Sequence, residues 1–436
     1  MTISTNIMRA FTALVLLASL SLQGCIKDKC DLEYTYSKYS PVYMSPEAFR
    51  NAVSVEAPHA VQNPGKIYVK DNYLFVSEVA KGVHIFDNKN PESPVALAFI
   101  NVPGNYDIAF NCDKLYVDSS TDLLVFDMNN PAQPQLINRI ENALPHIVFY
   151  RGYTADANKG VVVEWIQEVV TEKYNCETGV PPIWEDNQAN ASTIASMNGS
   201  TSRTINPATP GKGGSMSRFA VKDDYMYVVT PTQMVVYNAS VCESPSRMNT
   251  LDLENLWGGE AEMIFSMDNL LMIGSTNSMM IYDAADPVRP NYLSNFQHVT
   301  ACDPVTAKDG YAYVTLRGGD DNPCGDGFAN QLDVVNISEP RLPFLVQSFP
   351  MTAPAGLGLD GDMLFIADGA SGLRVFDASN PEKVGNNQLA NFPSMEGYDV
   401  IPNEGVLIMV GKDGIAQYDY ADPKNIKLLS TIAVVR

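Results

Sequence analysis

A unit of about forty residues recurs along this chain, and its repetition constrains the fold more than any other feature. In the copy at residues 71–94, DNYLFVSEVAKGVHIFDNKNPESP, the pair Asp71-Asn72 separates two short apolar runs, which indicates a β-hairpin. A third apolar run ends at Asp87, whose short acceptor side chain suits the turn that follows. Because the next residues include prolines, which cannot donate to a sheet, the chain leaves the sheet and re-enters it at 95–100. One repeat therefore predicts four short strands.

The other copies align on the position of Asp87. The equivalent residues are Asp127, Trp165, Asn238, Asp283, Asn336, Asp377 and Asp419. The second-strand pattern and the proline-containing exit recur in the same phase, and the copy at GYTAD, beginning at Gly152, is the weakest. Four strands at this period are typical of a propeller blade. We therefore expect an all-β fold, a β-propeller of about eight four-stranded blades, with seven as the alternative count.

The third strands carry a shared motif, which reads VHIFD, LLVFD, MMIYD, LRVFD and AQYDY in five copies. Over residues 66–436 these copies resemble the LVIVD-repeat family of bacterial surface and secreted proteins. The resemblance implies a propeller. It leaves the function open, because propellers carry many unrelated activities.

The N-terminal residues have the pattern of an export signal. Arg9 precedes an apolar run at 10–20, which is followed by Leu22-Gln23-Gly24-Cys25, so residues 1–24 are predicted to be a secretory signal peptide. Residues 22–25 resemble a lipobox, which makes Cys25 the lipid-modified N-terminus of the mature chain. A tether over 25–60 then leads to the propeller at 61–436. Lipid at Cys25 gives the chain its membrane partner.

Resemblance to bacterial lipoproteins also bears on localisation. Ile26 follows the lipid-bearing cysteine, and the lack of aspartate there favours the outer membrane. The charged residues 27–29 resemble a surface-export signal, although a solvated tether explains them equally well. We therefore expect a chain anchored in the outer membrane that faces either the periplasm or the cell surface.

Charge and cysteine content limit the functional classes further. The net charge is -21 and nothing in the sequence resembles a basic patch that could neutralise phosphates, so nucleic acid is not an expected partner. Besides Cys25, the cysteines of an exported chain are candidates for disulfides. Cys302 and Cys324 flank one hairpin and form one candidate pair, while the other pairings stay open. No CxxC motif supports a zinc ribbon or a redox site.

Two insertions interrupt the period, at 175–217 and 317–330. The first is rich in Ser, Thr, Asn and Gly and joins the outer strand of one blade to the inner strand of the next. The second joins a second strand to a third strand. In a four-stranded blade both connections emerge on the same face, which makes that face a candidate for binding. Neutral variation in loop length explains the insertions equally well.

The sequence contains no HExxH, no GxSxG and no phosphate-binding loop, so no catalytic motif marks a site. The alignment of the repeats nevertheless predicts one possible site. Counting back seven residues from each second strand marks the beginning of each innermost strand. Charged residues at or next to these positions are Asp107, His146, Arg218, Glu262, Asp303 and Asp399. We expect them to gather, solvated, around one end of the central channel. Channel mouths are polar in any propeller, so ligand binding is one of two interpretations.

The sequence therefore favours a non-catalytic binding or scaffold module of the cell envelope, with a protein or glycan partner that the sequence does not identify. The alternative is a propeller hydrolase or lactonase-like enzyme with a cation at the channel mouth, which requires several carboxylates and His146 to converge on one point. No cofactor and no metal site is expected. Asp320, Asp321 and Asp326 offer oxygen ligands to calcium but lack the order of an EF-hand, and a solvated acidic loop explains them more simply.

Overall fold

The computed structural model describes residues 33–150, 153–173, 217–253, 260–298, 304–318, 329–393, 395–423 and 425–435. The chain divides into two compact units, one comprising 1–38 with 167–195 and the other 39–166 with 196–436. The expected signal peptide and Cys25 lie outside the described residues. In the described part of the chain, no helix combines the length and apolar character needed to cross a membrane.

The second unit contains seven antiparallel sheets, which we name blades A to G in chain order. Blades A to C consist of β3 (Pro64–Lys70), β4 (Tyr73–Glu78), β5 (Gly82–Asp87) and β6 (Val95–Asn101); β7 (Ile108–Asn111), β8 (Lys114–Ser119), β9 (Asp122–Asp127) and β10 (Gln135–Ile140); and β14 (Phe219–Lys222), β15 (Tyr225–Val229), β16 (Gln233–Asn238) and β17 (Ser246–Asp252). Blades D to G consist of β18 (Ala261–Met267), β19 (Leu270–Ser275), β20 (Ser278–Asp283) and β21 (Asn291–Gln297); β22 (Val305–Lys308), β23 (Tyr311–Arg317), β24 (Asn330–Asn336) and β25 (Phe344–Pro350); β26 (Pro354–Asp360), β27 (Met363–Asp368), β28 (Leu373–Asp377) and β29 (Gln388–Phe392); and β30 (Gly397–Asn403), β31 (Val406–Gly411), β32 (Gly414–Asp419) and β33 (Lys427–Ala433).

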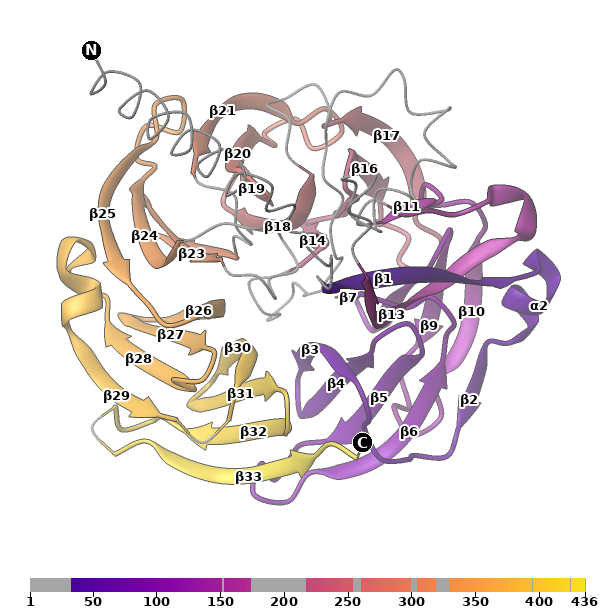
Figure 1. Ribbon diagram of the computed structural model, residues 1–436, viewed down its shortest axis with the longest axis horizontal. Coiled ribbons are helices and arrows are strands. Elements are labelled where there is room, and N and C mark those ends of the chain that lie inside the picture. Colours follow the sequence, from indigo (N-terminus) through magenta and orange to yellow (C-terminus); the bar gives the residue numbers. More distant parts are fainter. Residues whose placement is uncertain are drawn as a thin grey trace, which may run out of the picture. The chain divides into compact units, whose positions relative to one another are not determined.

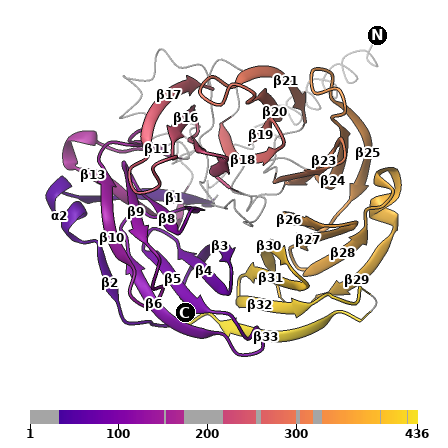
Figure 2. The same ribbon diagram turned by 180° about the vertical axis from the view of Figure 1, so that it is seen from behind.

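The seven blades close into a ring (Figures 1 and 2). The first strand of each blade packs against the first strand of the next, from β3 through β7, β14, β18, β22 and β26 to β30, which packs against β3 again. A cluster of buried apolar side chains fills each of the seven contacts between adjacent blades. The expected all-β propeller of four-stranded blades is confirmed. The count of eight is wrong, and the alternative count of seven is correct.

The surplus repeat is the one around Trp165. Its described residues form β11 (Phe149–Tyr150), β12 (Tyr153–Thr154), the 3-10 helix η1 (Ala157–Lys159) and the long strand β13 (Val161–Lys173). β11 pairs only with β12, and β13 pairs with β1 (Glu33–Met44), so this part of the chain forms no four-stranded sheet. All of residues 141–218 therefore belong to the connection between blades B and C.

A hydrogen bond at the end of the third strand distinguishes the true blades from this copy. In all seven blades the aligned Asp or Asn accepts a hydrogen bond from the backbone N–H two residues later, at 2.8–3.0 Å. This bond turns the chain out of the third strand, as the sequence predicted. Trp165 has no side-chain oxygen with which to accept such a bond.

The first hairpin of each blade also follows the prediction. Asp71, the first residue of the predicted two-residue turn in blade A, has φ of 53°. Type I′ turns need this left-handed conformation, and Asp tolerates it better than most residues. The corresponding residue has a positive φ in every other blade, namely Cys112, Asp223, Asp268, Asp309, Gly361 and Glu404.

The segment before blade A takes part in the fold. Residues 25–60 were assigned to a tether, and their described part contains β1, the helix α2 (Pro46–Asn51), which Ser45 caps, and β2 (Ser54–Glu56). β2 adds a fifth strand to blade A by pairing with β6. Val61 then forms a bridge with Val434, after the last strand of blade G. This segment therefore contributes to the junction where the ring closes.

One disulfide joins neighbouring blades. Cys112, in the first hairpin of blade B, is bonded to Cys242, between β16 and β17 of blade C. The bond links two blades that the 141–218 connection separates along the chain. The candidate pair Cys302 and Cys324 lies outside the described residues and stays a prediction.

Peptide mapping without reduction should recover one cross-linked pair of peptides that contain Cys112 and Cys242. Replacing both cysteines by alanine should lower the free energy of unfolding by about 2–4 kcal/mol, because the unfolded chain loses a covalent constraint. The single Cys112→Ala variant is the matched control and should lose about as much as the double variant. Recovery of Cys112 or Cys242 linked to a different cysteine would contradict the assignment.

Candidate ligand-binding site

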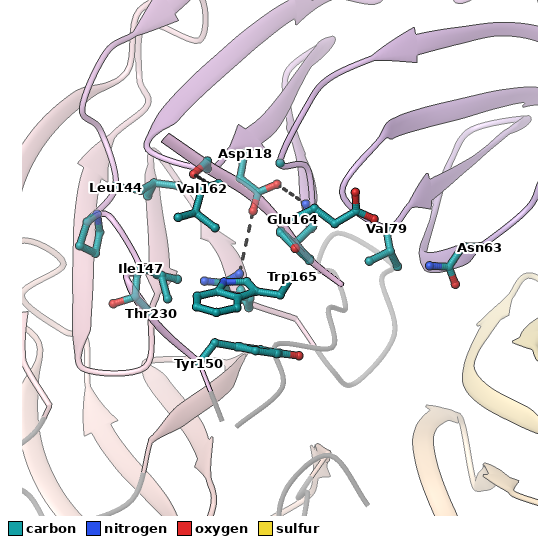
Figure 3. Close-up of a pocket in the computed structure, with 15 residues that line it drawn as sticks. Asn63, Val79, Asp118, Leu144, Ile147, Tyr150, Val162, Glu164, Trp165 and Thr230 are labelled. Carbon is teal, nitrogen blue, oxygen red and sulfur yellow. Dashed lines mark hydrogen bonds and ion pairs between the residues drawn. The ribbon is translucent and has the colours of Figure 1, made fainter. Parts of the chain in front are cut away.

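A pocket opens among blades A, B and C, on the face that carries the connections between second and third strands (Figure 3). Val79, Ser120 and Thr230 line it from those connections in the three blades. The connections between blades supply Gly104, Tyr106, Leu144 and Ile147. The cavity volume is about 160 Å³, smaller than the range of about 300–1,000 Å³ typical of drug-sized ligands. The pocket therefore suits a ligand of a few atoms or a single ring.

Two aromatic rings from the 141–218 connection form one wall of the pocket. The rings of Tyr150 and Trp165 are stacked, with centroids 5.3 Å apart and an interplanar angle of 26°, and Figure 3 shows them lying one over the other. Tyr39 packs edge-on against Tyr150. Trp165 is only half-buried, so the stack gives the pocket an apolar surface with a fixed orientation.

Strand β13, which carries Trp165, is fastened to the blades on both sides of the pocket. The hydroxyl of Ser120 donates to the carbonyl of Val162 at 2.7 Å. The ammonium of Lys81, from blade A, forms an ion pair with Glu164 at 2.6 Å. These contacts hold the aromatic wall over the ends of blades A and B.

The opposite side of the pocket is polar. Asp118, at the end of β8, accepts hydrogen bonds from the backbone N–H groups of Tyr106 and Asp107 and from the side chain of Asn105, at 2.7–2.9 Å. Its second carboxylate oxygen lies 4.0 Å from the guanidinium of Arg218. Burial raises the pKa of Asp118, and Arg218 and the hydrogen bonds oppose that shift. The pocket thus presents a carboxylate and a guanidinium opposite an aromatic face.

A buried ion pair lies behind this polar side. Lys66 Nζ is 3.5 Å from Asp107 Oδ2, and both side chains have 0% exposure. Asp107 also accepts a hydrogen bond from the backbone N–H of Arg218 at 2.8 Å. Burial lowers the pKa of Lys66 to about 7 and raises the pKa of Asp107 to about 7. This ion pair and the backbone hydrogen bond therefore link the ends of β3, β7 and β14.

The structure brings some of the six predicted site residues together. Asp107 and Arg218 are in direct contact. Asp399, on β30, lies close enough to favour the charged form of Lys66. Glu262 lies on β18 of blade D, and Asp303 is outside the described residues. Asp107, Arg218 and Asp399 thus gather around Lys66 of blade A.

Two of the expectations for these residues are wrong. Asp107 and Asp399 are buried, with 0% and 2% exposure, and not solvated. His146 does not begin an inner strand, because the 141–218 connection is not a blade; its Nε2 accepts the N–H of Val162 at 3.2 Å, and burial lowers its pKa. Gly356 explains part of the burial, since a β-carbon at this position of blade F would collide with the Asp399 carboxylate. The inner-strand charges therefore belong mainly to the scaffold.

Apart from Arg218, the residues that line the pocket carried no prediction from the sequence. Asp118 lies near the end of a second strand, whose pattern served only to align the repeats. Trp165 carried a usable signal, because it stands where every blade has Asp or Asn, and this departure marks a segment with another role. Nothing in the sequence pairs Trp165 with Tyr150, since their stacking depends on how the connection folds back.

Breaking the Lys66–Asp107 pair should be costly. Lys66→Met is expected to lower the free energy of unfolding by about 3–5 kcal/mol, because it leaves a buried carboxylate without its cation. Lys66→Met combined with Asp107→Asn should lose less than the sum of the two single variants. Urea unfolding measures all three. The control is Lys70→Met, which breaks the exposed pair with Asp71 and should cost less than about 1 kcal/mol. Equal losses for Lys66→Met and Lys70→Met would contradict the proposed importance of the buried pair.

Comparison with known proteins supports the repeat and the fold. Residues 356–384, in blade F, match the model of the LVIVD repeat, which confirms the resemblance for that segment. No curated protein matches this sequence.

Several solved structures share the architecture. A protein from Lactobacillus plantarum is 10% identical, with a TM-score of 0.54 over 85% of this chain and 97% of its own. The periplasmic gluconolactonase of Pseudomonas aeruginosa is 11% identical, with a TM-score of 0.52 over 85% of this chain and 95% of its own. The computationally designed protein Ika8 is 8% identical, with a TM-score of 0.50 over 87% and 91%. At these identities the likeness concerns the fold alone, and this chain is a seven-bladed β-propeller of four-stranded blades that carries an LVIVD repeat.

Proposed function

We propose that this chain is a non-catalytic binding module of a bacterial cell envelope, which takes one sugar ring of a glycan into the pocket among blades A, B and C. Lipid at Cys25 would anchor it in the outer membrane, facing the periplasm or the cell surface. This proposal unites the export signal in the sequence with a pocket that suits a single ring.

The observation that carries the proposal is the facing arrangement of aromatic and charged groups. A sugar ring has an apolar face, which packs on an aromatic ring such as that of Trp165, and hydroxyl groups at its edge. Asp118 and Arg218 provide an acceptor and donors for hydroxyl groups on the other side of the pocket. Few but well-placed polar groups in an otherwise apolar pocket are typical of small-molecule sites.

No observation favours the hydrolase or lactonase-like alternative. That function required several carboxylates and His146 within coordinating distance of one point. Across the part of the chain that the structure describes, the single group of potential metal ligands is His59, Glu78 and His84, which includes none of the predicted channel residues. Likeness to a gluconolactonase at 11% identity concerns the fold and supplies no active-site residues.

Isothermal titration calorimetry of the purified full-length protein with glucose, N-acetylglucosamine and glucuronate, and with short oligomers of each, tests the proposal. At least one of these probes should bind saturably. Trp165→Ala should weaken that binding about tenfold, or about 1.4 kcal/mol, because the ring loses its stacking surface. The control is Phe344→Ala, which truncates an exposed aromatic residue on β25 and should bind like the wild type. If no probe binds, or if Trp165→Ala binds as tightly as the control, glycan binding in this pocket is wrong.

The anchor is tested separately. Cys25→Ala should abolish incorporation of labelled palmitate and release the protein from the membrane fraction, because the acyl chains supply the membrane affinity. The released protein should keep the thermal midpoint of the wild type, since Cys25 precedes the blades. Undiminished palmitate labelling of the variant would refute the assignment.

A further inference from the structure

A second group of chemically reactive side chains lies on blade A, outside the pocket. It comprises His59, from the segment before the blade, Glu78, at the end of β4, and His84, on β5. Each residue offers a ligand atom, and these atoms all lie within 4.8 Å of one another. Two imidazole nitrogens and one carboxylate oxygen are a ligand set that zinc binds in proteins, with water at the fourth position.

Blade F shows how a carboxylate at this position serves the fold. Glu78 precedes the aligned Asp87 by nine residues, and Asp368 precedes Asp377 in blade F by the same interval. Both carboxylates accept backbone N–H bonds from the chain that enters their blade, Glu78 from Gln62 and Asp368 from Thr352 and Ala353. A buried carboxylate at this position is therefore part of the scaffold.

The partner of the carboxylate differs between the two blades. In blade F, Asp368 is paired with Arg374 at 3.0 Å. His84 occupies the position in blade A that corresponds to Arg374, three residues before the aligned Asp, and its Nε2 lies 2.6 Å from Glu78 Oε2. Blade A thus has an imidazole, which can bind a metal, where blade F has a permanent cation, which cannot.

The segment before blade A brings the third ligand. His59 is exposed, and its ring packs edge-on against that of His84, with centroids 4.8 Å apart. Its Nδ1 lies 3.0 Å from the carbonyl oxygen of Ala60. When Nδ1 donates to that carbonyl, Nε2 is left as the ligand atom, an arrangement that is common for metal-binding histidines.

The surroundings suit a metal that is bound at the surface. Phe99 packs against both imidazole rings, with centroids 4.3 Å from His59 and 4.6 Å from His84, and so limits their rotation. Glu78 and His84 are buried, with 4% and 2% exposure, whereas exposed His59 leaves one side of the group open to water. Burial opposes the charged form of Glu78, yet its contact with His84 and the N–H of Gln62 keep its pKa below the usual value.

We propose that His59, Glu78 and His84 bind one divalent metal ion of the zinc class, which fastens the segment before blade A to the second and third strands of that blade. A tetrahedral ion with bonds of about 2.0–2.1 Å needs its nitrogen and oxygen ligands about 3.3 Å apart, so the ion takes the place of the close His84–Glu78 contact after a small rotation of the carboxylate. β2 and Val61, on either side of His59, already pair with β6 and Val434. The ion therefore adds a third attachment of this segment near the closure of the ring.

The test uses full-length protein that has been stripped of metal with a chelator. Titration with Zn²⁺ by calorimetry should give one ion per chain, and Co²⁺ should give the visible absorption of a tetrahedral site. His59→Ala and His84→Arg should each weaken Zn²⁺ binding at least tenfold. His84→Arg reproduces the pair in blade F, so it removes the ligand while keeping a cation for Glu78. His298→Ala, which removes a histidine outside the group, is the control and should bind like the wild type.

Two further measurements separate a structural ion from incidental binding. Zn²⁺ should raise the thermal midpoint of the wild type and slow proteolysis between residues 54 and 60, and it should do neither for His59→Ala. His59 is exposed, so this variant remains informative even if His84→Arg fails to fold. Wild-type protein that binds no Zn²⁺, or His59→Ala that binds it with unchanged affinity, would overturn the proposal. The pocket variant Trp165→Ala should keep full Zn²⁺ binding, so this inference and the proposed glycan site fail independently.

Discussion

Each sheet of this protein can bury its two faces only against its neighbours, and the whole architecture follows from that constraint. Seven apolar clusters lie between adjacent blades, so no blade is stable in isolation and the ring must close. All four strands of every blade come from one continuous stretch of chain, so no exchanged strand fastens the first blade to the last. The bridge between Val61 and Val434 joins the two blades instead, together with the side chains of Asn88 and Gln417, which bond each other in both directions at 2.8 and 2.7 Å.

Comparison of the repeats also shows which residues serve the common fold and which are particular to a few blades. Asp118 lies in the pocket, but Asp368 accepts equivalent backbone hydrogen bonds in blade F, so those bonds of Asp118 are structural. What is particular to blades A to C is the material added around the common frame, namely the stacked rings of Tyr150 and Trp165 and the imidazole of His59. The aromatic wall of the proposed glycan site and the His59 ligand of the proposed metal site therefore lie outside the repeat.

The fold could be predicted because its signals are local. The acceptor at Asp87 and the turn at Asp71 act on the backbone within a few residues, so sequence alone locates the acceptor in every blade and the turn in most of them. The number of blades could not be predicted in the same way. The spacing of the repeats alone counts Trp165 as an eighth copy, although Trp165 has no acceptor oxygen. Burial of Asp107 depends on Lys66, which comes from a different blade. His59 and Glu78 meet only because the segment before blade A folds back onto it, which no repeat pattern records.

The bond between Cys112 and Cys242 has a consequence for how this chain tolerates change. It spans the connection that separates blades B and C, so the two blades remain one molecule even if the peptide chain is cut within residues 141–218. The disulfide thus closes a covalent loop that contains the whole connection between blades B and C. A cut or an added residue in this connection therefore leaves blades B and C covalently joined to each other.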